Sequence, residues 1–305
     1  MKAYVRLDAS TQEVRLSEMP KPQVGPDEVL IEVKAFGVGI HDRYFIPMNI
    51  TFPYVIGSEG AGIIAETGRA VADFKTGDFT TILQSKGGSW AEYAVANAST
   101  LIPLPENLTF AQGAALPIAG KTALESVRKL GLEKGDRLFI AGASGAIGTL
   151  VIQLEAKKGI RVAASASARN HDYMKELGAE KVVDYKNSSW TEEVKTWADN
   201  KGVTAALAIQ PGTGADSVRV VADGGLLITV SGDNASVLPQ RGVDIRQMGH
   251  QEETAAKMAD LVSAVSKGDI KVVIEKEFPF EEALEALRKT ETRRARGKLV
   301  VVMNA

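Results

Sequence analysis

The sequence predicts an α/β protein in which a β-rich domain is interrupted by a second domain built on a doubly wound parallel sheet. Three observations support this prediction. The first hundred or so residues contain short apolar segments bounded by Gly and Pro. From about residue 120, short apolar segments alternate with helical patterns. The chain then closes with an apolar strand at 298–303, for which a complete parallel sheet has no obvious place.

The β-rich part is expected to form a compact, partly closed β domain, because short strands separated by Gly and Pro turns are typical of such domains. Its strands are predicted within the segments 29–40, 57–68, 76–83 and 87–96.

The parallel-sheet part begins with a helical pattern at 122–132. Strands then recur about every 20 to 30 residues with helices between them, which indicates a parallel sheet with helices on both faces. The predicted strands lie at 136–143, 161–164, 181–185, 204–209 and 224–232, and the predicted helices at 146–159, 171–177 and 191–199.

Helical patterns at 252–267 and 280–287 precede the closing strand, and the apolar spacing of 280–287 is typical of core packing. We expect the strand at 298–303 to return to the β-rich domain. The predicted domains are therefore 1–115 together with 251–305, and the inserted domain 116–250.

Composition excludes several classes of protein. The 305 residues carry a net charge of −2 and contain 45% hydrophobic and 24% charged residues, so no global basic field attracts nucleic acid or membrane. The basic run 293–298 is interpreted as a solvated loop. Without cysteine, disulfides, thiolate nucleophiles and cysteine–zinc sites are ruled out. Because no apolar signal core or spanning segment is visible, a cytoplasmic protein is expected.

A glycine-rich turn joins the predicted strand at 136–143 to the helix at 146–159. Gly142, Gly145 and Gly148 allow a sharp turn, a close approach of pyrophosphate to the backbone, and packing of the helix on the strand. The amides from Ser144 through Gly145 and Ala146 to Ile147 would face the anion at the helix start. The alternative is a purely structural turn, but the strand–turn–helix–strand order favours dinucleotide binding.

The end of the next strand indicates which dinucleotide is bound. NAD sites usually place a carboxylate there, whereas this strand is followed by Ser165, Ser167 and Arg169, with no acid before Asp172. Hydroxyls and a guanidinium suit a 2′-phosphate. The prediction is NADP(H). The alternative for Arg169 is a solvated residue at a helix start.

The two-domain order resembles the medium-chain dehydrogenase/reductase superfamily, and within it the zinc-independent quinone oxidoreductase (zeta-crystallin-like) branch. The resemblance implies a GroES-like β domain with an inserted Rossmann domain. It covers nearly the whole chain and rests on the stretches GSEGAG (57–62), GGSWAEYAVA (87–96), AALPIAGKTALESV (114–127), GDRLFIAGASGAIG (135–148), LGAEKVVDY (177–185) and RGKLVV (296–301).

The sequence departs from the zinc-using members of this superfamily. Their Gly-His-Glu motif reads Gly57-Ser58-Glu59 here, and no thiolate is present. His41 and Asp42 stand where those relatives carry early ligands, but His41 is interpreted as a structural or pocket residue. No metal is expected.

Further site residues follow from the resemblance alone. Tyr185 matches a tyrosine beside the adenosine phosphate, and Thr122, Ser231 and Gly232 match positions that line the nicotinamide end. Thr122 is equally interpreted as a helix-start residue that satisfies backbone amides.

The segment 38–46 departs from the pattern Asn-x-x-Asp-x-Tyr-x-Arg of similar quinone reductases. Asp42 and Tyr44 remain, while Gly39 and Ile46 replace Asn and Arg. Tyr44 is the candidate catalytic donor, its phenol stabilising a developing enolate. Alternatively, Tyr44 packs beside Phe45.

The resemblance implies an NADPH-dependent reductase of quinones or α,β-unsaturated carbonyls that works without metal, in the cleft between the domains. The alternatives are a zinc-type alcohol dehydrogenase of the same superfamily, and a non-catalytic NADP(H)-binding sensor or structural protein. By analogy, the segment 243–247 is expected to extend a partner's sheet in a homodimer. No nucleic-acid or membrane partner is expected.

Overall fold

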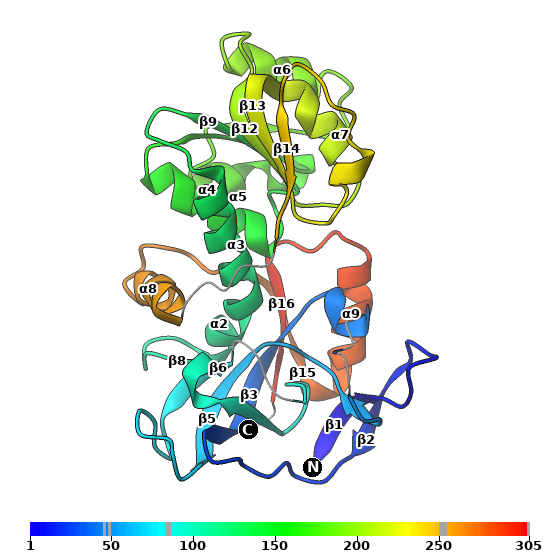
Figure 1. The fold of residues 1–305 in the computed structure, drawn as a ribbon, viewed down its shortest axis with the longest axis vertical. Coiled ribbons are helices and arrows are strands. Elements are labelled where there is room, and N and C mark those ends of the chain that lie inside the picture. Colours follow the sequence, from blue (N-terminus) through cyan, green and yellow to red (C-terminus); the bar gives the residue numbers. More distant parts are fainter. Residues whose placement is uncertain (45–46, 48–49, 83–86, 250–254, 304–305) are drawn as a thin grey trace. The chain divides into compact units, whose positions relative to one another are not determined.

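The computed structural model describes residues 1–44, 47, 50–82, 87–249 and 255–303. The chain divides into two compact units, Met1–Ala119 with Thr254–Ala305, and Gly120–Glu253 (Figure 1). The predicted positions Phe45 and Ile46, and the beginning of the helix predicted from 252, lie outside the described residues.

The first unit is β-rich, as predicted. A seven-stranded sheet has the order β15-β16-β3-β5-β6-β8, with β7 also paired to β3, and a three-stranded sheet has the order β2-β1-β4. The strands are β1 (Lys2–Arg6), β2 (Val14–Glu18), β3 (Glu28–Val38), β4 (Tyr54–Val55), β5 (Gly60–Thr67), β6 (Phe79–Ile82), β7 (Tyr93–Asn97), β8 (Leu101–Pro103), β15 (Ile274–Pro279) and β16 (Lys298–Val302).

The central strand β3 explains how this unit closes. Most of its residues are buried, as suits a strand covered on both faces. Its first half pairs with β7 and its last residues pair antiparallel with β16. In Figure 1 the red β16 lies beside the blue β3. The predicted return of the closing strand to the β-rich unit is thus confirmed.

Aromatic packing joins the beginning and end of the chain within this unit. The rings of Phe36 and Trp90 are stacked with centroids 5.0 Å apart. The Tyr4 hydroxyl donates a hydrogen bond of 2.8 Å to the carbonyl of Phe280. Offset and edge-on ring pairs of this kind contribute beyond their buried area, so the C-terminal segment is part of the core of the β-rich unit.

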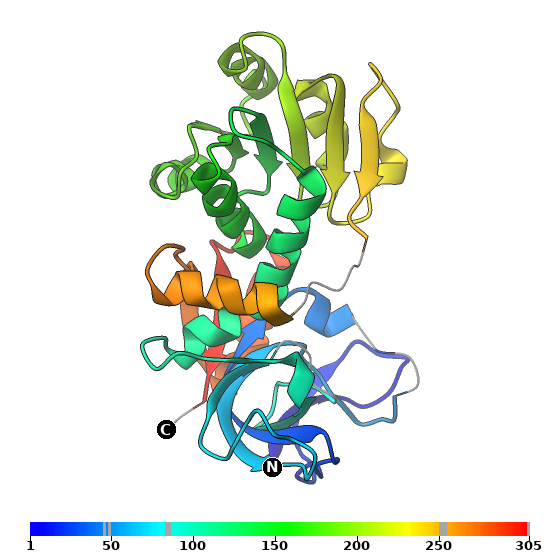
Figure 2. The same cartoon turned by 60° about the vertical axis from the view of Figure 1, so that its left-hand side comes forward.

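The second unit is the predicted doubly wound domain. Its six parallel strands have the order β11-β10-β9-β12-β13-β14. The strands are β9 (Arg137–Ala141), β10 (Arg161–Ser165), β11 (Lys181–Val183), β12 (Val203–Ala208), β13 (Val221–Thr229) and β14 (Asp244–Gln247). Figure 2 shows β14, in gold, at one edge of this sheet. Because the strand order reverses between β9 and β12, their carboxyl ends form the switch point at which such sheets bind ligands.

Helices separate these strands and precede the closing strand. They are α3 (Pro117–Leu130), α4 (Ala146–Lys157), α5 (His171–Glu176), α6 (Trp190–Trp197), α7 (Gly214–Ser217), α8 (Ala255–Ser266) and α9 (Ala283–Glu291), with α2 (Phe110–Ala115) and the short α1 (His41–Tyr44) earlier in the chain. None of the helices in the described part of the chain has the length and apolar character that a membrane crossing needs.

Candidate functional site

The predicted phosphate cradle lies between β9 and α4. Gly142 has a φ of +79°, a left-handed conformation that favours glycine. A Cβ at Gly148 would lie 2.5 Å from the Ala143 carbonyl oxygen, so this glycine lets the helix pack against the turn. A Cβ at Gly145 would meet no atom nearer than the Gly142 oxygen, at 3.7 Å. The space beside Gly145, at the helix start, is therefore open.

The sheet register brings other predicted residues to the same edge. Ala141 at the end of β9 is aligned with Ser165 on β10 and with Ala208 on β12. Ser165 is aligned in turn with Val183 on β11, and Ala208 with Thr229 on β13. The segments that follow these positions contain the glycine turn and the residues Ser167, Arg169, Tyr185, Ser231 and Gly232.

The segment after β10 carries the residues predicted to select the 2′-phosphate. Ser165 is buried at the strand end, and the Ser167 hydroxyl accepts a hydrogen bond of 3.3 Å from the Asn170 side chain. Arg169 is exposed on a 3₁₀ turn (Ala168–Asn170) that precedes α5. No carboxylate stands at the end of β10, so the residues present fit a 2′-phosphate better than free ribose hydroxyls. This placement of Arg169 fits a phosphate ligand and also the alternative of a solvated residue.

One contact at this edge could not be read from the sequence. The Tyr173 hydroxyl on α5 donates a hydrogen bond of 2.6 Å to the carbonyl of Ser144 in the glycine turn. Because Ser144 is one of the predicted cradle residues, Tyr173 ties the helix after β10 to the cradle. Tyr185 lies just beyond β11 with 54% of its surface exposed.

The residues predicted to line the nicotinamide end have defined local roles. The Ser231 hydroxyl donates to the Ile209 carbonyl, and Gly232 has a φ of +79°. The neighbouring Asp233 carboxylate accepts from the Gly212 amide at 2.9 Å, so the loops after β12 and β13 are joined. Thr122 lies inside α3, which begins at Pro117. The alternative that Thr122 is a helix-start residue is therefore wrong.

These residues fit a dinucleotide cofactor. The open space at Gly145 and the backbone amides at the start of the 12-residue helix α4 provide an anion site. NAD sites usually carry an acid at this place, and an acid would repel a 2′-phosphate. Here the place is taken by Ser165, Ser167 and Arg169.

The β-rich unit holds a second group of polar residues on and around α1. The Asp42 side chain is completely buried, and its Oδ2 accepts a hydrogen bond of 2.7 Å from the Gly39 amide. His41 Nε2 lies 3.4 Å from Asp42 Oδ1. Burial raises the pKa of the Asp42 carboxyl, and the charges of His41 and Lys298 oppose that rise. Tyr44, at the end of α1, is 51% exposed and is not a core side chain.

In the Gly57-Ser58-Glu59 segment, the Glu59 carboxylate is bound by groups within the protein. The buried Glu59 forms an ion pair with Lys298 on β16, and its Oε2 accepts a hydrogen bond of 2.7 Å from the Ile118 amide. Lys298 is buried too, so the end of the basic run 293–298 is not a surface patch. Within the described ranges, no three His, Asp or Glu side chains are grouped so that they could hold a metal ion.

Two arginines fix the position of α1. Arg43 forms an ion pair with Glu291 on α9 and donates a hydrogen bond of 3.1 Å to the Gln12 carbonyl. Arg6 is buried and donates to the Arg43 carbonyl at 3.4 Å. Because both guanidinium groups bind other groups of the β-rich unit, α1 is anchored within this unit.

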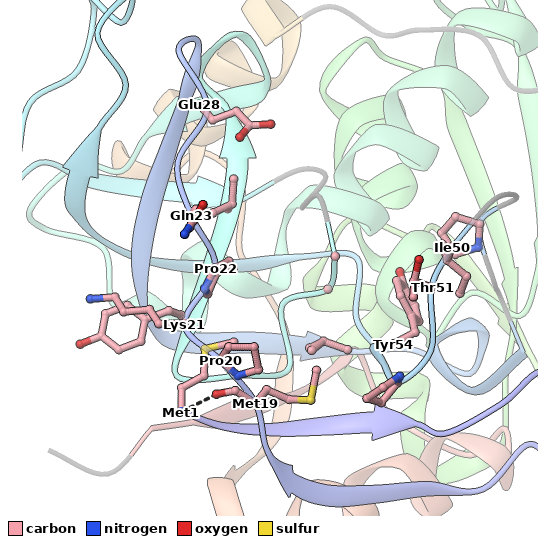
Figure 3. Close-up of a pocket in the computed structure, with 18 of the residues that line it drawn as sticks. Met1, Met19, Pro20, Lys21, Pro22, Gln23, Glu28, Ile50, Thr51 and Tyr54 are labelled. Carbon is pink, nitrogen blue, oxygen red and sulfur yellow. Dashed lines mark hydrogen bonds between the residues drawn. The ribbon is translucent and has the colours of Figure 1, made fainter.

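The β-rich unit also contains a groove of about 1060 Å³ (Figure 3). Met1, Met19, Pro20 and Pro22 line one side, and Ile50, Thr51 and Tyr54 line another. The Lys21 ammonium lies 3.9 Å from the centre of the Tyr93 ring. None of the residues predicted from sequence as catalytic or cofactor-binding lines this groove.

Comparison with known families and curated proteins shows which proteins this chain is similar to. The profile described as alcohol dehydrogenase GroES-like domain matches residues 25–106, and that described as zinc-binding dehydrogenase matches residues 177–301. A quinone oxidoreductase of Rattus norvegicus is 29% identical over 284 residues, which are 88% of this chain and 86% of the relative. A mitochondrial NAD(P)H oxidoreductase of Mus musculus is 32% identical over 280 residues, which are 82% of this chain and 70% of the relative.

Solved structures agree with this placement. A NAD-dependent alcohol dehydrogenase has a TM-score of 0.90 and 26% identity, with all of both chains covered. A mycobacterial protein solved in complex with NADPH has a TM-score of 0.86 and 25% identity, covering 99% of this chain and 100% of that chain. On the evidence of its fold, its glycine turn and these relatives, the chain belongs to the medium-chain dehydrogenase/reductase superfamily, in the zinc-independent quinone oxidoreductase branch.

Proposed function

We propose that the protein is an NADPH-dependent reductase that transfers hydride to a quinone or an α,β-unsaturated carbonyl compound without a metal ion. The observation that carries the proposal is the open glycine cradle at Gly145, followed at the next strand end by Ser165, Ser167 and Arg169 in place of an acid. The names of the rat and mouse relatives and the NADPH complex of the mycobacterial protein support the same reaction class.

In this proposal each group of residues has one task. The amides from Ser144 to Ile147 hold the pyrophosphate, Arg169 pairs with the 2′-phosphate, and Tyr185 lies beside the adenosine end. Thr122, Ser231 and Gly232 position the nicotinamide ring. NADPH, when bound, supplies the hydride.

Tyr44 has a different task, because it acts on the acceptor. Its half-exposed phenol donates a hydrogen bond to the substrate oxygen on which negative charge develops. Quinones and conjugated enones delocalise that charge themselves, and therefore do not need the metal that an alcohol dehydrogenase uses to stabilise alkoxide.

The test is consumption of NADPH, followed by the absorbance of the reduced nicotinamide, with a panel of quinones and enones. We expect turnover with at least one member of the panel and none with simple saturated aldehydes. A zinc-type alcohol dehydrogenase would instead oxidise alcohols and depend on added zinc. One solved neighbour is named as a NAD-dependent alcohol dehydrogenase. A non-catalytic sensor would bind NADPH and consume none.

We also propose a cytoplasmic homodimer. β14 is an edge strand with three exposed residues, and it pairs only with β13 among the strands that the structure describes. Light scattering after size exclusion should give a mass of about 65 kDa, twice the chain mass of 32.5 kDa. A mass equal to that of one chain would contradict the homodimer.

A further inference from the structure

A buried tyrosine on α5 contacts the glycine turn, and the proposed function gives it no task. The Tyr173 side chain is 7% exposed, and its hydroxyl donates a hydrogen bond of 2.6 Å to the carbonyl oxygen of Ser144. Both residues belong to the α/β unit. Because Ser144 is part of the proposed pyrophosphate cradle, this hydrogen bond ends on the backbone that would hold the cofactor.

The hydrogen bond fixes the orientation of one peptide group, the one that joins Ser144 to Gly145. In a planar trans peptide the C=O and the N–H point in opposite directions. The Ser144 carbonyl accepts from Tyr173, and the Gly145 amide donates a hydrogen bond of 3.3 Å to the Gly142 carbonyl. The plane of this peptide is therefore held from both sides.

The orientation of this peptide affects any anion that binds beside Gly145. The amides of Ala146 and Ile147 begin α4, whose first helical hydrogen bond runs from the Thr149 amide to the Gly145 carbonyl at 3.0 Å. Amides before that bond have no acceptor within the helix, and the Gly145 amide can be shared between two acceptors, as is common at helix ends. The Ser144 carbonyl oxygen carries partial negative charge, so it would repel the anion if its peptide rotated toward the space beside Gly145.

The helix that carries Tyr173 is itself fixed at its start to the edge of the parallel sheet. His171 Nε2, in the first residue of α5, lies at a hydrogen-bond distance of 3.1 Å from the Ala166 carbonyl oxygen. The Ala166 amide donates a hydrogen bond of 3.1 Å to the Val183 carbonyl on β11. Tyr173 therefore reaches the cradle from a helix that is anchored to the sheet, which gives its hydroxyl a defined position.

We propose that Tyr173 is a positioning residue of the cofactor site, whose hydroxyl holds the Ser144 carbonyl away from the pyrophosphate and so keeps the cradle favourable to an anion. This inference rests on the cofactor site of the proposed function. The pyrophosphate is common to NADPH and NADH, whereas only NADPH carries the 2′-phosphate. Tyr173 therefore contributes to the affinity for both cofactors. The choice between them is the task proposed for Arg169.

The central test compares the wild-type protein with Tyr173→Phe, which keeps the ring and removes the hydroxyl. Fluorescence titrations should show the dissociation constants of NADPH and of NADH raised by the same factor, about fivefold, as expected for the loss of one hydrogen bond. At saturating NADPH, kcat for a quinone should stay within about twofold, because the substitution weakens cofactor binding and leaves the reacting groups in place.

Tyr4→Phe is the matched control for the loss of a buried tyrosine hydroxyl. The Tyr4 hydroxyl donates a hydrogen bond of 2.8 Å to the Phe280 carbonyl in the β-rich unit, so this variant also loses a bond to a backbone carbonyl. Both variants should lower Tm by similar amounts, about 2–4 °C. Only Tyr173→Phe should weaken the binding of the cofactors.

A donor restored at the same place should restore binding. Replacement of Tyr173 by 4-aminophenylalanine, whose amino group is a hydrogen-bond donor at the position of the hydroxyl, should return both dissociation constants to within about twofold of the wild-type values. Dissociation constants that stay as high as those of Tyr173→Phe would show that the lost donor is not the cause, and would overturn the proposal.

Failure of this inference can be told from failure of the proposed function. Unchanged dissociation constants in Tyr173→Phe, a loss confined to NADPH, or an equal loss in Tyr4→Phe would each overturn the role of Tyr173 and leave the reductase function intact. If the wild-type protein bound NADPH but reduced no acceptor, the reductase function would be overturned, and the same titrations would still decide the role of Tyr173. If it bound neither cofactor, both would be overturned.

Discussion

Arg169 is the side chain on which the choice between the two dinucleotide cofactors depends most directly. It lies two residues after Ser167, beyond the end of β10. Strand β10 pairs with β9, the strand that precedes the glycine turn. A guanidinium at this place can form charge-assisted hydrogen bonds to a phosphate, which are stronger than those between neutral groups. A ribose hydroxyl offers no such charge.

We therefore expect Arg169→Ala to weaken NADPH binding by about 10-fold or more, since hydrogen bonds to charged groups contribute about 1.5–3 kcal/mol. NADH binding should change by less than about twofold, because NADH lacks the 2′-phosphate. Fluorescence titrations with both cofactors measure the two constants. Arg219→Ala, at another exposed arginine of the same unit, is the control and should leave both unchanged. Equal losses for NADPH and NADH would contradict the assigned role.

Asp42 gives a prediction about pH and stability. Burial raises the pKa of its carboxyl in the folded protein. Such a carboxyl keeps a proton that the unfolded chain has already released, so the free energy of unfolding falls as pH rises from about 4 through the raised pKa. Asp42→Asn cannot ionise. Thermal unfolding followed by circular dichroism should therefore show a smaller loss of stability between about pH 5 and about pH 8 in the variant than in wild type.

Asp8 is the matched control for this experiment. Its pKa is lowered, mainly by a hydrogen bond from the Ser10 hydroxyl, and its side chain is partly exposed. A carboxyl with a lowered pKa is ionised in both folded and unfolded chains over the same pH range, so Asp8→Asn should leave the slope unchanged. If Asp42→Asn retained the wild-type slope, Asp42 would not be the group responsible.

At the scale of elements, two glycines of the strand–turn–helix formed by β9 and α4 have different tasks, one in binding and one in folding. A Cβ at Gly145 has room, whereas a Cβ at Gly148 would collide with the backbone of Ala143. We expect Gly145→Ala to fold with a Tm close to that of wild type and to bind NADPH at least about 10-fold more weakly, because the methyl group occupies the phosphate approach. Gly148→Ala should lose stability itself, by about 1–3 kcal/mol.

Thermal unfolding and NADPH titration of the two variants check this difference. A destabilised Gly145→Ala, or a Gly145→Ala that binds NADPH as wild type does, would show that the open space at Gly145 is not the pyrophosphate site.

The elements that could be predicted from sequence are those with strong local patterns. The inner strands β9, β10 and β12 of the parallel sheet are mostly apolar and buried, and the glycine turn has its own spacing, so these elements could be identified from sequence. β15 was not predicted, because Lys276 and Glu277 interrupt its apolar pattern and its pairing with β16 is a long-range contact. The ion pair of Glu59 with Lys298 joins residues far apart in the chain. The contact of His41 with Asp42 depends on the conformation of α1. Neither contact follows from the helix or strand periodicity of the sequence, so neither could be predicted from it.

At the scale of the whole molecule, the proposed cofactor site belongs to the α/β unit and the proposed donor Tyr44 to the β-rich unit, and the proposed reaction uses no metal. The acid of the Gly57-Ser58-Glu59 segment is already paired with the Lys298 ammonium. A divalent ion at this place would meet that positive charge rather than a set of ligands.

We therefore expect dialysis against EDTA to leave NADPH-dependent turnover unchanged, and elemental analysis of the purified protein to find zinc at well below one atom per chain. Addition of zinc should not raise activity. Loss of activity on chelation, restored by zinc, would contradict the metal-free mechanism and favour the alcohol dehydrogenase alternative.

A titration of the purified protein with NADPH and with NADH, followed by nicotinamide fluorescence and completed by adding 1,4-benzoquinone to each complex, tests the proposed function most directly. We expect tighter binding of NADPH and quinone-dependent loss of the reduced nicotinamide signal. Tighter binding of NADH, or an NADPH complex that no quinone or enone can oxidise, would contradict it.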